Sequence, residues 1–430
     1  MAIFKQHTFY NTTKISLWSN QNFVFELIKI KHFVYNILLY EKIVLPLQKN
    51  IIMEQENPFI SKGYVSKELF CDRKNELKNL ARNAKNGLDT TLFADRKIGK
   101  TGLIYRFFDY LEEKNSKYSS VYVDIFSSRC LDDFVKLFSE AILRKYPEKT
   151  SFGKSFLKIL KSFRPIISFN PITGEPQILI SYQNEAEKHY TLKGILDFLE
   201  NRNEPVVLAI DEFQQITEYP ETNIEALLRT YVQQVKNIRF IFCGSKTSLI
   251  TEMFSNSKRP FFNSTSFLHL DKIDEKIYFD FIKDNFEKHK KKIDQEAIHF
   301  ILDWTLRHTF YTQYLCNQTF SLSKKKVTIA EVKAACKSIF MQNEAIFLQY
   351  RRLLTSAQWN FLIAVAKEET LVQPTAKDFL LKYKIGTSAH AKRHLNALID
   401  KDLIIDKPTK TETHYYLYDI FLLRWLQSVY

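Results

Sequence analysis

Two short segments of the chain carry residue types that suit phosphate chemistry. Gly99-Lys100-Thr101 places a flexible turn, an amine and a hydroxyl in a row, and Asp211-Glu212 places two carboxylates side by side. Gly99 would let the backbone approach a phosphate, Lys100 would reach the β- and γ-phosphates, and the Thr101 hydroxyl would bind Mg²⁺. Asp211 would hold the same ion, while Glu212 would polarise the water that attacks in an in-line phosphoryl transfer. We therefore predict Lys100, Asp211 and Glu212 as catalytic residues.

The surroundings of Gly99 fit this prediction. The run Thr90-Thr-Leu-Phe favours a β-strand, and the residues after the turn place apolar side chains at helical spacing. These apolar side chains are Leu103, Ile104, Phe107 and Phe108. A strand, a glycine-containing loop and a helix in this order are what a phosphate-binding loop requires. Ile98 and Gly102 belong to the same predicted loop.

The loop departs from the full phosphate-binding pattern, which has glycine five positions before Gly99. Ala94 stands there, and alanine tolerates a positive φ less well than glycine does. Asp95 also puts a carboxylate into a loop meant for anions. We expect the loop to work if residue 94 has a negative φ and the Asp95 side chain points outward.

Strands and helices alternate along this part of the chain. The run 205–212 is continuously apolar until its two acids, which is typical of a strand buried on both faces of a parallel sheet. The run 237–245 has the same character and ends at Ser245, which is either a polar sensor beside the γ-phosphate or part of a plain turn. The run 120–126 is a further strand, followed by helical spacing over 131–142. This alternation predicts a three-layer α/β domain with a mostly parallel sheet.

These segments resemble the archaeal-type P-loop ATPases, which are related to the AAA+ and signal-transduction ATPases, and the resemblance extends from residue 57 to residue 430. Phe70, Arg73 and Glu76 match the family's pattern F-x-x-R-x-x-E-L, which implies that Arg73 lies near the adenine. Asp211-Glu-Phe-Gln looks like the family's Walker B element. The resemblance implies ATP and Mg²⁺ as cofactors, with Thr101 and Asp211 on the metal. The nucleotide-binding residues would be Arg73, Ile98, Gly99, Lys100, Thr101, Gly102 and Ser245.

The resemblance also brings in three residues with open roles. Arg259 matches a position that faces a neighbouring subunit's phosphate in such proteins, or it anchors a loop. His308 begins a segment similar to the family's G-H-P-x-x-x-Q, where a packed lid residue is expected. Arg307 stands where glycine is usual, and it is either a lid sensor or a solvated cation at a helix end.

A helical lid is expected over 271–346. Apolar spacing predicts helices over 275–288 and 294–307, with the lysine-rich run 288–293 on the turn between them. That run is either a solvated loop or a contact to phosphate or nucleic acid. Upstream of the second acidic strand, residues 170–176 are predicted to turn a hairpin between β-prone runs at 166–169 and 178–181.

The last 84 residues, 347–430, look like a winged helix. We expect helices over 356–367, 375–383 and from Thr387, wing strands at 403–406 and 413–418, and a closing helix from Asp419. The third helix would expose side chains that suit phosphates and base edges: His390, Lys392, Arg393, His394 and Asn396. The domain has 12 Lys and Arg against 8 Asp and Glu, which is a modest excess for a DNA-binding surface. Contact with DNA and contact with a protein partner therefore both stay open.

Composition sets the outer limits. The chain has 430 residues, 26% of them charged and 45% hydrophobic, with 9 Gly and 11 Pro, which excludes disordered and collagen-like proteins. Its formal net charge is +14. Part of this excess follows from the many lysines that an AT-rich coding sequence produces. The five cysteines form no C-x-x-C pair, so we expect a reducing cytoplasm rather than a disulfide scaffold.

The domain plan follows from these signals. Residues 53–270 would form the P-loop α/β domain, followed by the lid and the winged helix. Our hypothesis for residues 1–52 is an upstream extension outside the native protein, because Met53 stands just before the recognisable domain start. No uncharged apolar run is long enough to span a membrane, and a membrane-associated protein would depend wholly on residues 1–52.

The predicted function is a Mg²⁺-dependent ATPase whose nucleotide state moves the lid and winged helix as a switch. The alternative is a DNA- or partner-binding scaffold that holds nucleotide without hydrolysing it, which Ala94 and Asp95 keep open. Assembly into an oligomer is compatible with either function.

Overall fold

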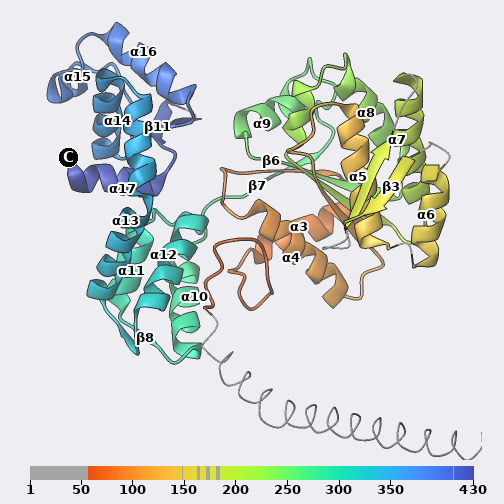
Figure 1. Ribbon diagram of the computed structural model, residues 1–430, viewed down its shortest axis with the longest axis horizontal. Coiled ribbons are helices and arrows are strands. Elements are labelled where there is room, and N and C mark those ends of the chain that lie inside the picture. Colours follow the sequence, from red (N-terminus) through yellow and green to blue (C-terminus); the bar gives the residue numbers. More distant parts are fainter. Residues whose placement is uncertain (1–56, 148, 162–164, 171–174, 181–184, 410) are drawn as a thin grey trace, which may run out of the picture. The chain divides into compact units, whose positions relative to one another are not determined.

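The computed structural model describes residues 57–147, 149–161, 165–170, 175–180, 185–409 and 411–430 (Figure 1). The predicted N-terminal extension lies outside the described residues, as does the tip of the predicted hairpin at 171–174. Within the described residues, no helix combines the length and apolar character needed to cross a membrane.

A five-stranded sheet forms the centre of the first part of the chain. Its strands lie in the order β2-β5-β6-β1-β7, and all neighbouring pairs are parallel. The strands are β1 (Thr90–Phe93), β2 (Ser119–Asp124), β5 (Val206–Asp211), β6 (Ile238–Gly244) and β7 (Ser266–His269). Every residue of β5 is buried, as its continuous apolar run predicted, because helices cover both faces of the sheet. The predicted parallel sheet is confirmed.

Alternate residues of the strands pack on two separate helical layers. Val207 and Ala209 of β5 belong to the core formed with α3 (Lys74–Lys85) and α4 (Lys100–Glu113). Leu208 and Ile210 belong to the core on the opposite face. The helices of that face are α5 (Leu131–Lys145), α6 (Ser151–Lys161), α7 (Glu185–Glu200), α8 (Ile224–Gln234) and α9 (Thr247–Ser255). Because successive side chains of a strand point to opposite faces, the three-layer arrangement follows directly from the apolar runs.

The predicted hairpin strands are present as an antiparallel pair, β3 (Pro165–Phe169) and β4 (Pro176–Ile180). Helix α6 (Ser151–Lys161) precedes them. A side-chain bond joins the pair to the sheet domain, because the backbone N–H of Ile178 donates to Glu140 Oε1 of α5 at 2.9 Å.

The lid is helical, with one short parallel strand pair. Its helices are α10 (Glu275–Lys288), α11 (Gln295–Trp304), α12 (Thr309–Leu322) and α13 (Ile329–Leu353), and its strands are β8 (Lys292–Ile293) and β9 (Lys326–Val327). Helix α10 has the predicted bounds. The predicted helix 294–307 ends earlier, at Trp304, because Leu306 and Arg307 adopt positive φ values of 52° and 56°, which no right-handed helix accommodates.

The C-terminal part has the predicted winged-helix elements. They are α14 (Ser356–Glu368), α15 (Lys377–Tyr383), α16 (Ser388–Ile399), β10 (Ile404–Pro408), β11 (Thr413–Leu417) and α17 (Ile420–Val429). Thr387 and Asp419 cap α16 and α17 by accepting bonds from backbone N–H groups with their side chains.

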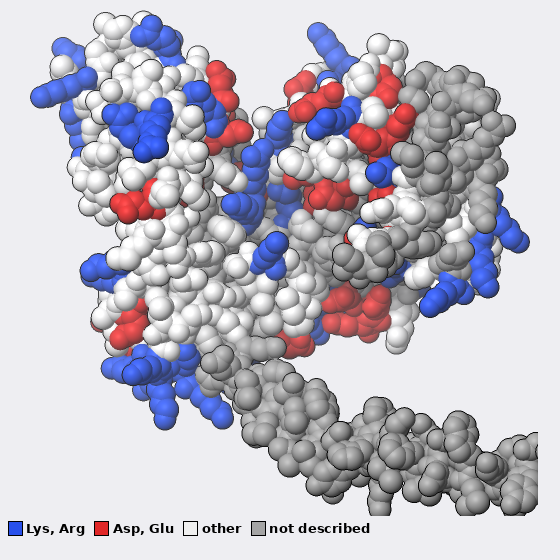
Figure 2. Space-filling view, in the orientation of Figure 1, with Lys and Arg blue, Asp and Glu red and all other residues white. Residues whose placement is uncertain are grey.

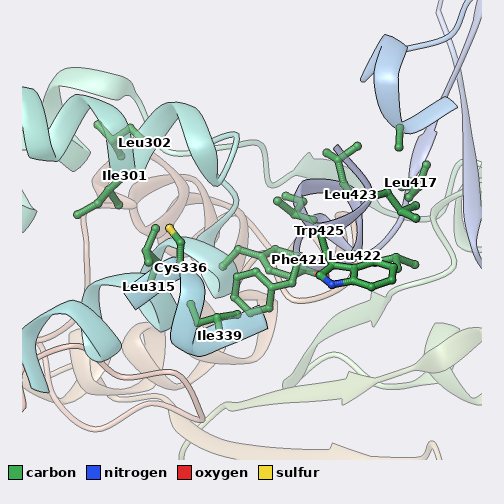
Figure 3. Close-up of a cluster of buried hydrophobic side chains, with 14 of the residues drawn as sticks. Ile301, Leu302, Leu315, Cys336, Ile339, Leu417, Phe421, Leu422, Leu423 and Trp425 are labelled. Carbon is green, nitrogen blue, oxygen red and sulfur yellow. The ribbon is translucent and has the colours of Figure 1, made fainter. Parts of the chain in front are cut away.

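The lid and the winged helix share one hydrophobic core. Ile301, Leu315 and Ile339 of the lid belong to the same cluster as Phe421 and Trp425 of α17, as Figure 3 shows. Helix α13 runs continuously from the lid past residue 347 to Leu353. A shared core and a shared helix make it difficult to move one of these parts without the other.

Candidate functional site

Five of the predicted site residues meet at the carboxyl ends of three strands. Lys100 and Thr101 open α4 after the loop that follows β1. Asp211 is the last residue of β5, Glu212 comes next, and Ser245 follows β6. Because β5 pairs with β6 and β6 pairs with β1, these ends lie next to one another. This edge of an open α/β sheet is where such folds bind ligands.

The loop of residues 94–99, which we call the Gly99 loop, turns sharply into α4. Gly99 has φ 106°, a conformation that favours glycine. Ala94 is fully buried and is not among the described residues with positive φ. Its carbonyl accepts a hydrogen bond from Lys100 Nζ at 2.9 Å, and the Asp95 carbonyl accepts a second at 3.2 Å. The first condition set for Ala94 is thus met.

Asp95 meets the second condition, because its side chain faces away from Lys100. The Asp95 carboxylate lies 3.7 Å from Lys407 Nζ of strand β10, in the winged helix. The carboxylate therefore does not compete for the space in front of the Gly99 loop.

The Lys100 side chain is buried, with 6% of the residue exposed. Burial lowers its pKa, and the nearby Asp211 and Glu212 carboxylates act in the opposite direction. An ammonium in this position has few solvent contacts and is held by two carbonyls, so it is preorganised for an anion.

Asp211 is a hub of hydrogen bonds. Its Oδ2 accepts from Thr101 Oγ1 and from the Tyr122 hydroxyl, both at 2.9 Å. Burial, followed by the charge of Asp211, raises the pKa of Tyr122, so the phenol stays a donor. On the adjacent strand, Asp124 pairs in register with Asp211, and burial raises the pKa of its carboxyl.

Glu212 is held by three donors on a single oxygen. Its Oε2 accepts from Gln214 Nε2 at 2.6 Å, Ser245 Oγ at 2.8 Å and Ser245 N at 3.3 Å. The residue itself has φ 56°, an uncommon conformation for glutamate. Glu212 and Ser245, which were predicted separately, are therefore in direct contact.

Two residues of this constellation were missed from the sequence, Tyr122 and Gln214. Tyr122 lies within a predicted strand, and the pattern of polar and apolar residues along that strand does not reveal that the Tyr122 hydroxyl binds Asp211. Gln214 is the second residue after Glu212, and this short separation could have indicated a contact with the Glu212 carboxylate. Gln214 is buried, and a Cβ added to Gly244 would lie 2.3 Å from its Oε1, so this side chain depends on the glycine.

A cavity of about 670 Å³ opens in front of the Gly99 loop. All the predicted nucleotide-binding residues line it: Arg73, Ile98, Gly99, Lys100, Thr101, Gly102 and Ser245, together with Asp211 and Glu212. Gly102 allows close packing here, because a Cβ on it would lie 3.3 Å from the Phe70 ring. The cavity is large enough for a nucleotide-sized ligand.

Arg73 lines the cavity from the position just before α3. It adopts φ 66° just before α3, and its Nη1 donates to Glu76 Oε1 at 3.2 Å. Its Nη2 is buried and has no hydrogen-bond partner among the described residues. The two residues that match the family's pattern, Arg73 and Glu76, therefore form an ion pair that leaves Arg73 Nη2 unused within the described part of the chain.

Helix α12 of the lid covers the cavity and contacts the Gly99 loop. His308 Nε2 lies 3.1 Å from the Arg96 carbonyl, and burial lowers the pKa of His308 to about 4. A neutral ring at pH 7 donates this bond from Nε2. The Lys97 ammonium lies 4.4 Å from the centre of the Phe310 ring, a cation–π contact.

The same helix presents two more polar side chains. Thr309 and Gln313 line the cavity, and each leaves a buried oxygen without a partner among the described residues. Their segment was predicted as part of the lid, but neither side chain was predicted as a site residue.

The two arginines with open roles lie elsewhere. Arg259 Nη2 lies 2.6 Å from Glu225 Oε1, which fits a loop anchor. Arg307 lies 4.0 Å from Glu275 and is half-buried at a turn. Neither is among the residues that line the cavity in the described part of the chain.

The donor set around Asp211 suits a hard cation. Thr101 Oγ1 and Asp211 Oδ2 are 2.9 Å apart, close to the separation of adjacent oxygens around an octahedral Mg²⁺ with ligand distances of about 2.1 Å. The described residues contain no cluster of three or more His, Cys, Asp or Glu side chains able to hold a metal by itself. A cation here would need ligands from phosphates and water, as Mg²⁺ usually does.

Comparisons with known proteins match two parts of the chain. A family model described as an ATPase domain predominantly from Archaea matches residues 70–306, and one described as a probable winged helix domain matches residues 345–428. No curated protein sequence matches the chain.

Solved structures share the fold. A Walker-type ATPase of Pyrococcus abyssi is 16% identical with a TM-score of 0.58, over 86% of this chain and 99% of that protein. The ORC2 protein of Aeropyrum pernix, solved in ADPNP–ADP complexes, is 17% identical with a TM-score of 0.54, over 87% of this chain and 97% of that protein. The first family model spans more than half of the residues, and the predicted resemblance is confirmed: this chain belongs to the family of ATPase domains found predominantly in Archaea.

Proposed function

We propose that the protein binds ATP with Mg²⁺, hydrolyses it slowly, and uses the nucleotide state to move its lid and winged helix. One observation carries the proposal: an amine, a hydroxyl and two carboxylates from separate strand ends converge on a cavity of nucleotide size. Membership of an ATPase-domain family and the ADPNP–ADP complexes of the ORC2 protein agree with it.

Each side chain has a separate task in this proposal. Lys100 leaves the Ala94 and Asp95 carbonyls and binds phosphate oxygens, with the backbone N–H groups at the start of α4. Thr101 and Asp211 hold Mg²⁺, which would neutralise charge on the phosphates. The adenine side of the nucleotide lies toward Arg73.

Glu212 orients and polarises the attacking water. Its Oε2 already accepts three hydrogen bonds, which hold the carboxylate in one orientation. Its second oxygen is the one left to accept a proton from water, while Ser245 stays beside it as the polar sensor.

The route from nucleotide to winged helix runs through the Gly99 loop. Three consecutive loop residues contact other parts of the chain: Asp95 faces Lys407, the Arg96 carbonyl binds His308, and Lys97 lies over Phe310. The lid and winged helix share a core, so a phosphate that shifts this loop would move both together.

The output surface is the winged helix. His390, Lys392, Arg393 and Asn396 of α16 are exposed, whereas His394 is half-buried against Phe361. Exposed basic and amide groups on this helix suit DNA. A protein partner is the other candidate, since the domain's charge excess is modest.

The experiment separates binding from turnover. We expect Lys100→Ala to lose ATP binding, and Glu212→Gln to bind ATP while phosphate release falls by about 100-fold or more. Lys114→Ala, an exposed lysine at the end of α4, is the matched control and should resemble the wild type. Unchanged ATP binding in Lys100→Ala would reject the proposed site.

The scaffold alternative has its own signature. A protein that holds nucleotide without hydrolysis would show ATP binding sensitive to Lys100→Ala, but no phosphate release that Glu212→Gln could lower. Repeating the phosphate assay with duplex DNA tests the switch, because stimulated release requires coupling between the winged helix and the cavity.

A further inference from the structure

A second charged surface lies at the end of the lid, away from the cavity. Parallel pairing of β8 with β9 brings two lysine runs together, with Lys292 opposite Lys326. Figure 2 shows Lys and Arg side chains gathered at the lower left, where Figure 1 places β8. We call this surface the lid lysine cluster, and its exposed members are Lys288, Lys290, Lys292, Lys324, Lys325 and Lys326.

The cluster is built on a fixed backbone. The N–H of Lys292 donates to the Lys325 carbonyl at 2.8 Å, and the N–H of Asp294 donates to the Val327 carbonyl at 2.9 Å. Lys291 points inward, and its ammonium binds the carbonyls of Phe320 and Ser323 at the end of α12. One lysine thus ties the two runs to each other, while its neighbours point to solvent.

This arrangement holds like charges close together. Side chains directly opposite on paired strands are near neighbours, and like charges there repel each other. Three acids lie close by: Glu287, which is exposed, Asp294, whose Oδ2 is 3.7 Å from Lys326 Nζ, and Glu331, which interacts electrostatically with Lys326. Because three carboxylates cannot neutralise six ammonium groups, an anionic partner with several charges would relieve the repulsion.

We propose that the lid lysine cluster binds the phosphate backbone of nucleic acid without regard to sequence. A repeating polyanion matches two short rows of flexible ammonium groups, which act as point charges and do not read base edges. A membrane surface fits less well, because Leu322 is the one large exposed hydrophobic residue of the described segments 287–294 and 322–327.

The cluster is separate from the winged helix and goes beyond the proposed function. Helix α13 begins just after β9, and its 25 residues give it a length of about 37 Å, so the cluster and the winged helix lie at opposite ends of this helix. None of the six lysines lines the cavity described above. Nucleic acid held here would be a second contact, independent of α16 and of nucleotide chemistry.

The test compares two charge-matched triple variants of the full chain. The first changes Lys324, Lys325 and Lys326 to Gln, and the second changes the exposed lysines Lys78, Lys85 and Lys114 of α3 and its surroundings to Gln. The probe is a labelled duplex of random sequence, measured by fluorescence anisotropy over a salt series. Thermal melting and phosphate release show that each variant is folded.

We expect the lid variant to bind the duplex at least about tenfold more weakly. The slope of log K against log salt concentration should become shallower by about 2.7, since each of the three lost phosphate contacts removes about 0.9. The control triple should keep the slope of the wild type. The same difference should remain in a Lys392→Gln, Arg393→Gln background, which weakens the winged helix alone.

Other results would overturn the proposal. Equal losses in the two triple variants would mean that net charge, rather than this surface, sets the affinity. If the lid variant kept duplex binding but lost binding to vesicles of anionic phospholipid, the cluster would be a membrane contact instead. The outcome of the Lys100→Ala experiment does not affect this test, because the duplex-binding measurement uses no nucleotide and thermal melting alone can show that each variant is folded.

Discussion

The cavity has two sides that differ in how their polar groups are satisfied. The floor consists of Lys100, Thr101, Asp211, Glu212 and Ser245, and each of these side chains has a hydrogen-bond partner. The roof consists of Arg73, Thr309 and Gln313, and each leaves a buried nitrogen or oxygen without a partner in the described part of the chain.

The difference separates a rigid part of the site from one that awaits its ligand. The floor rests on the parallel sheet, whose strand ends fix its side chains before anything binds. An unpaired buried polar atom costs about 1–3 kcal/mol, which a bound ligand would recover by supplying the missing partner. We therefore expect floor variants to affect chemistry and roof variants to affect affinity and stability.

The largest expected effect is on the floor. Asp211→Asn removes the negative charge of the group that accepts hydrogen bonds from Thr101 and Tyr122. It also removes the carboxylate that we propose as a Mg²⁺ ligand. We expect phosphate release to fall by about 100-fold or more at fixed Mg²⁺. Asp124→Asn, at the matching position of the neighbouring strand, should keep most of the activity. Similar losses in both would show that the whole strand end, rather than Asp211, carries the effect.

On the roof side, acid should weaken the contact between lid and loop. The pKa of His308 is about 4 when folded and near 6.5 when unfolded. The unfolded state therefore binds more protons between these values, and this contribution to stability is lost as the pH falls from 6.5 to 4. We expect the resulting loss in the free energy of unfolding to reach about 3 kcal/mol at most.

Urea unfolding at pH 7 and at pH 4.5 measures this loss. His308→Gln should lack that part of the pH dependence, whereas Lys114→Ala should keep it. If His308→Gln and the wild type showed the same pH dependence, the ring would not be buried in its neutral form.

Gln313→Leu tests whether the roof awaits a ligand. Removing an unsatisfied amide should leave the nucleotide-free protein as stable as before or more stable, while ATP binds roughly tenfold more weakly. Thermal melting without ATP measures the stability of the nucleotide-free protein, and the shift on adding ATP measures the strength of ATP binding. A variant that is less stable without ATP and binds it normally would mean that the amide has a partner inside the protein.

The smallest expected effect concerns the support of the floor. Tyr122→Phe deletes one of the two side-chain donors to Asp211 and should cost about 1 kcal/mol, which raises the Mg²⁺ concentration for half-maximal activity roughly fivefold. Turnover at saturating Mg²⁺ should stay near that of the wild type. Tyr105→Phe, whose ring packs against Tyr122, is the matched control.

Local sequence signals predicted much of the fold and of the floor. The apolar run of β5 identifies a buried strand, and the spacing of α10 gives its bounds to the residue. The third winged-helix helix was predicted from Thr387, which the structure shows as the residue that caps α16. Gly99 and the acids at 211 and 212 were recognisable because their chemistry depends on neighbours in sequence.

The roof was not predictable in this way. Gln313 matters because a lid helix lies over the loop, and Asp95 faces outward because Lys407 happens to lie there. Both facts depend on residues hundreds of positions apart. The early end of α11 depends on two residues with positive φ that carry no glycine signal. The lysines at 324–326 become part of a larger basic surface only because β9 pairs with β8, which brings Lys326 opposite Lys292.

The bonds from Lys100 to the carbonyls of Ala94 and Asp95 have a consequence for selectivity among anions. In the free protein the ammonium is already occupied, so an incoming anion must replace two hydrogen bonds before it gains any. A single orthophosphate or sulfate ion would replace these two hydrogen bonds of Lys100 and gain few further contacts. A triphosphate would also contact Thr101 and the start of α4. The protein should therefore ignore the abundant small anions of a cell and respond to the longer chain of charges.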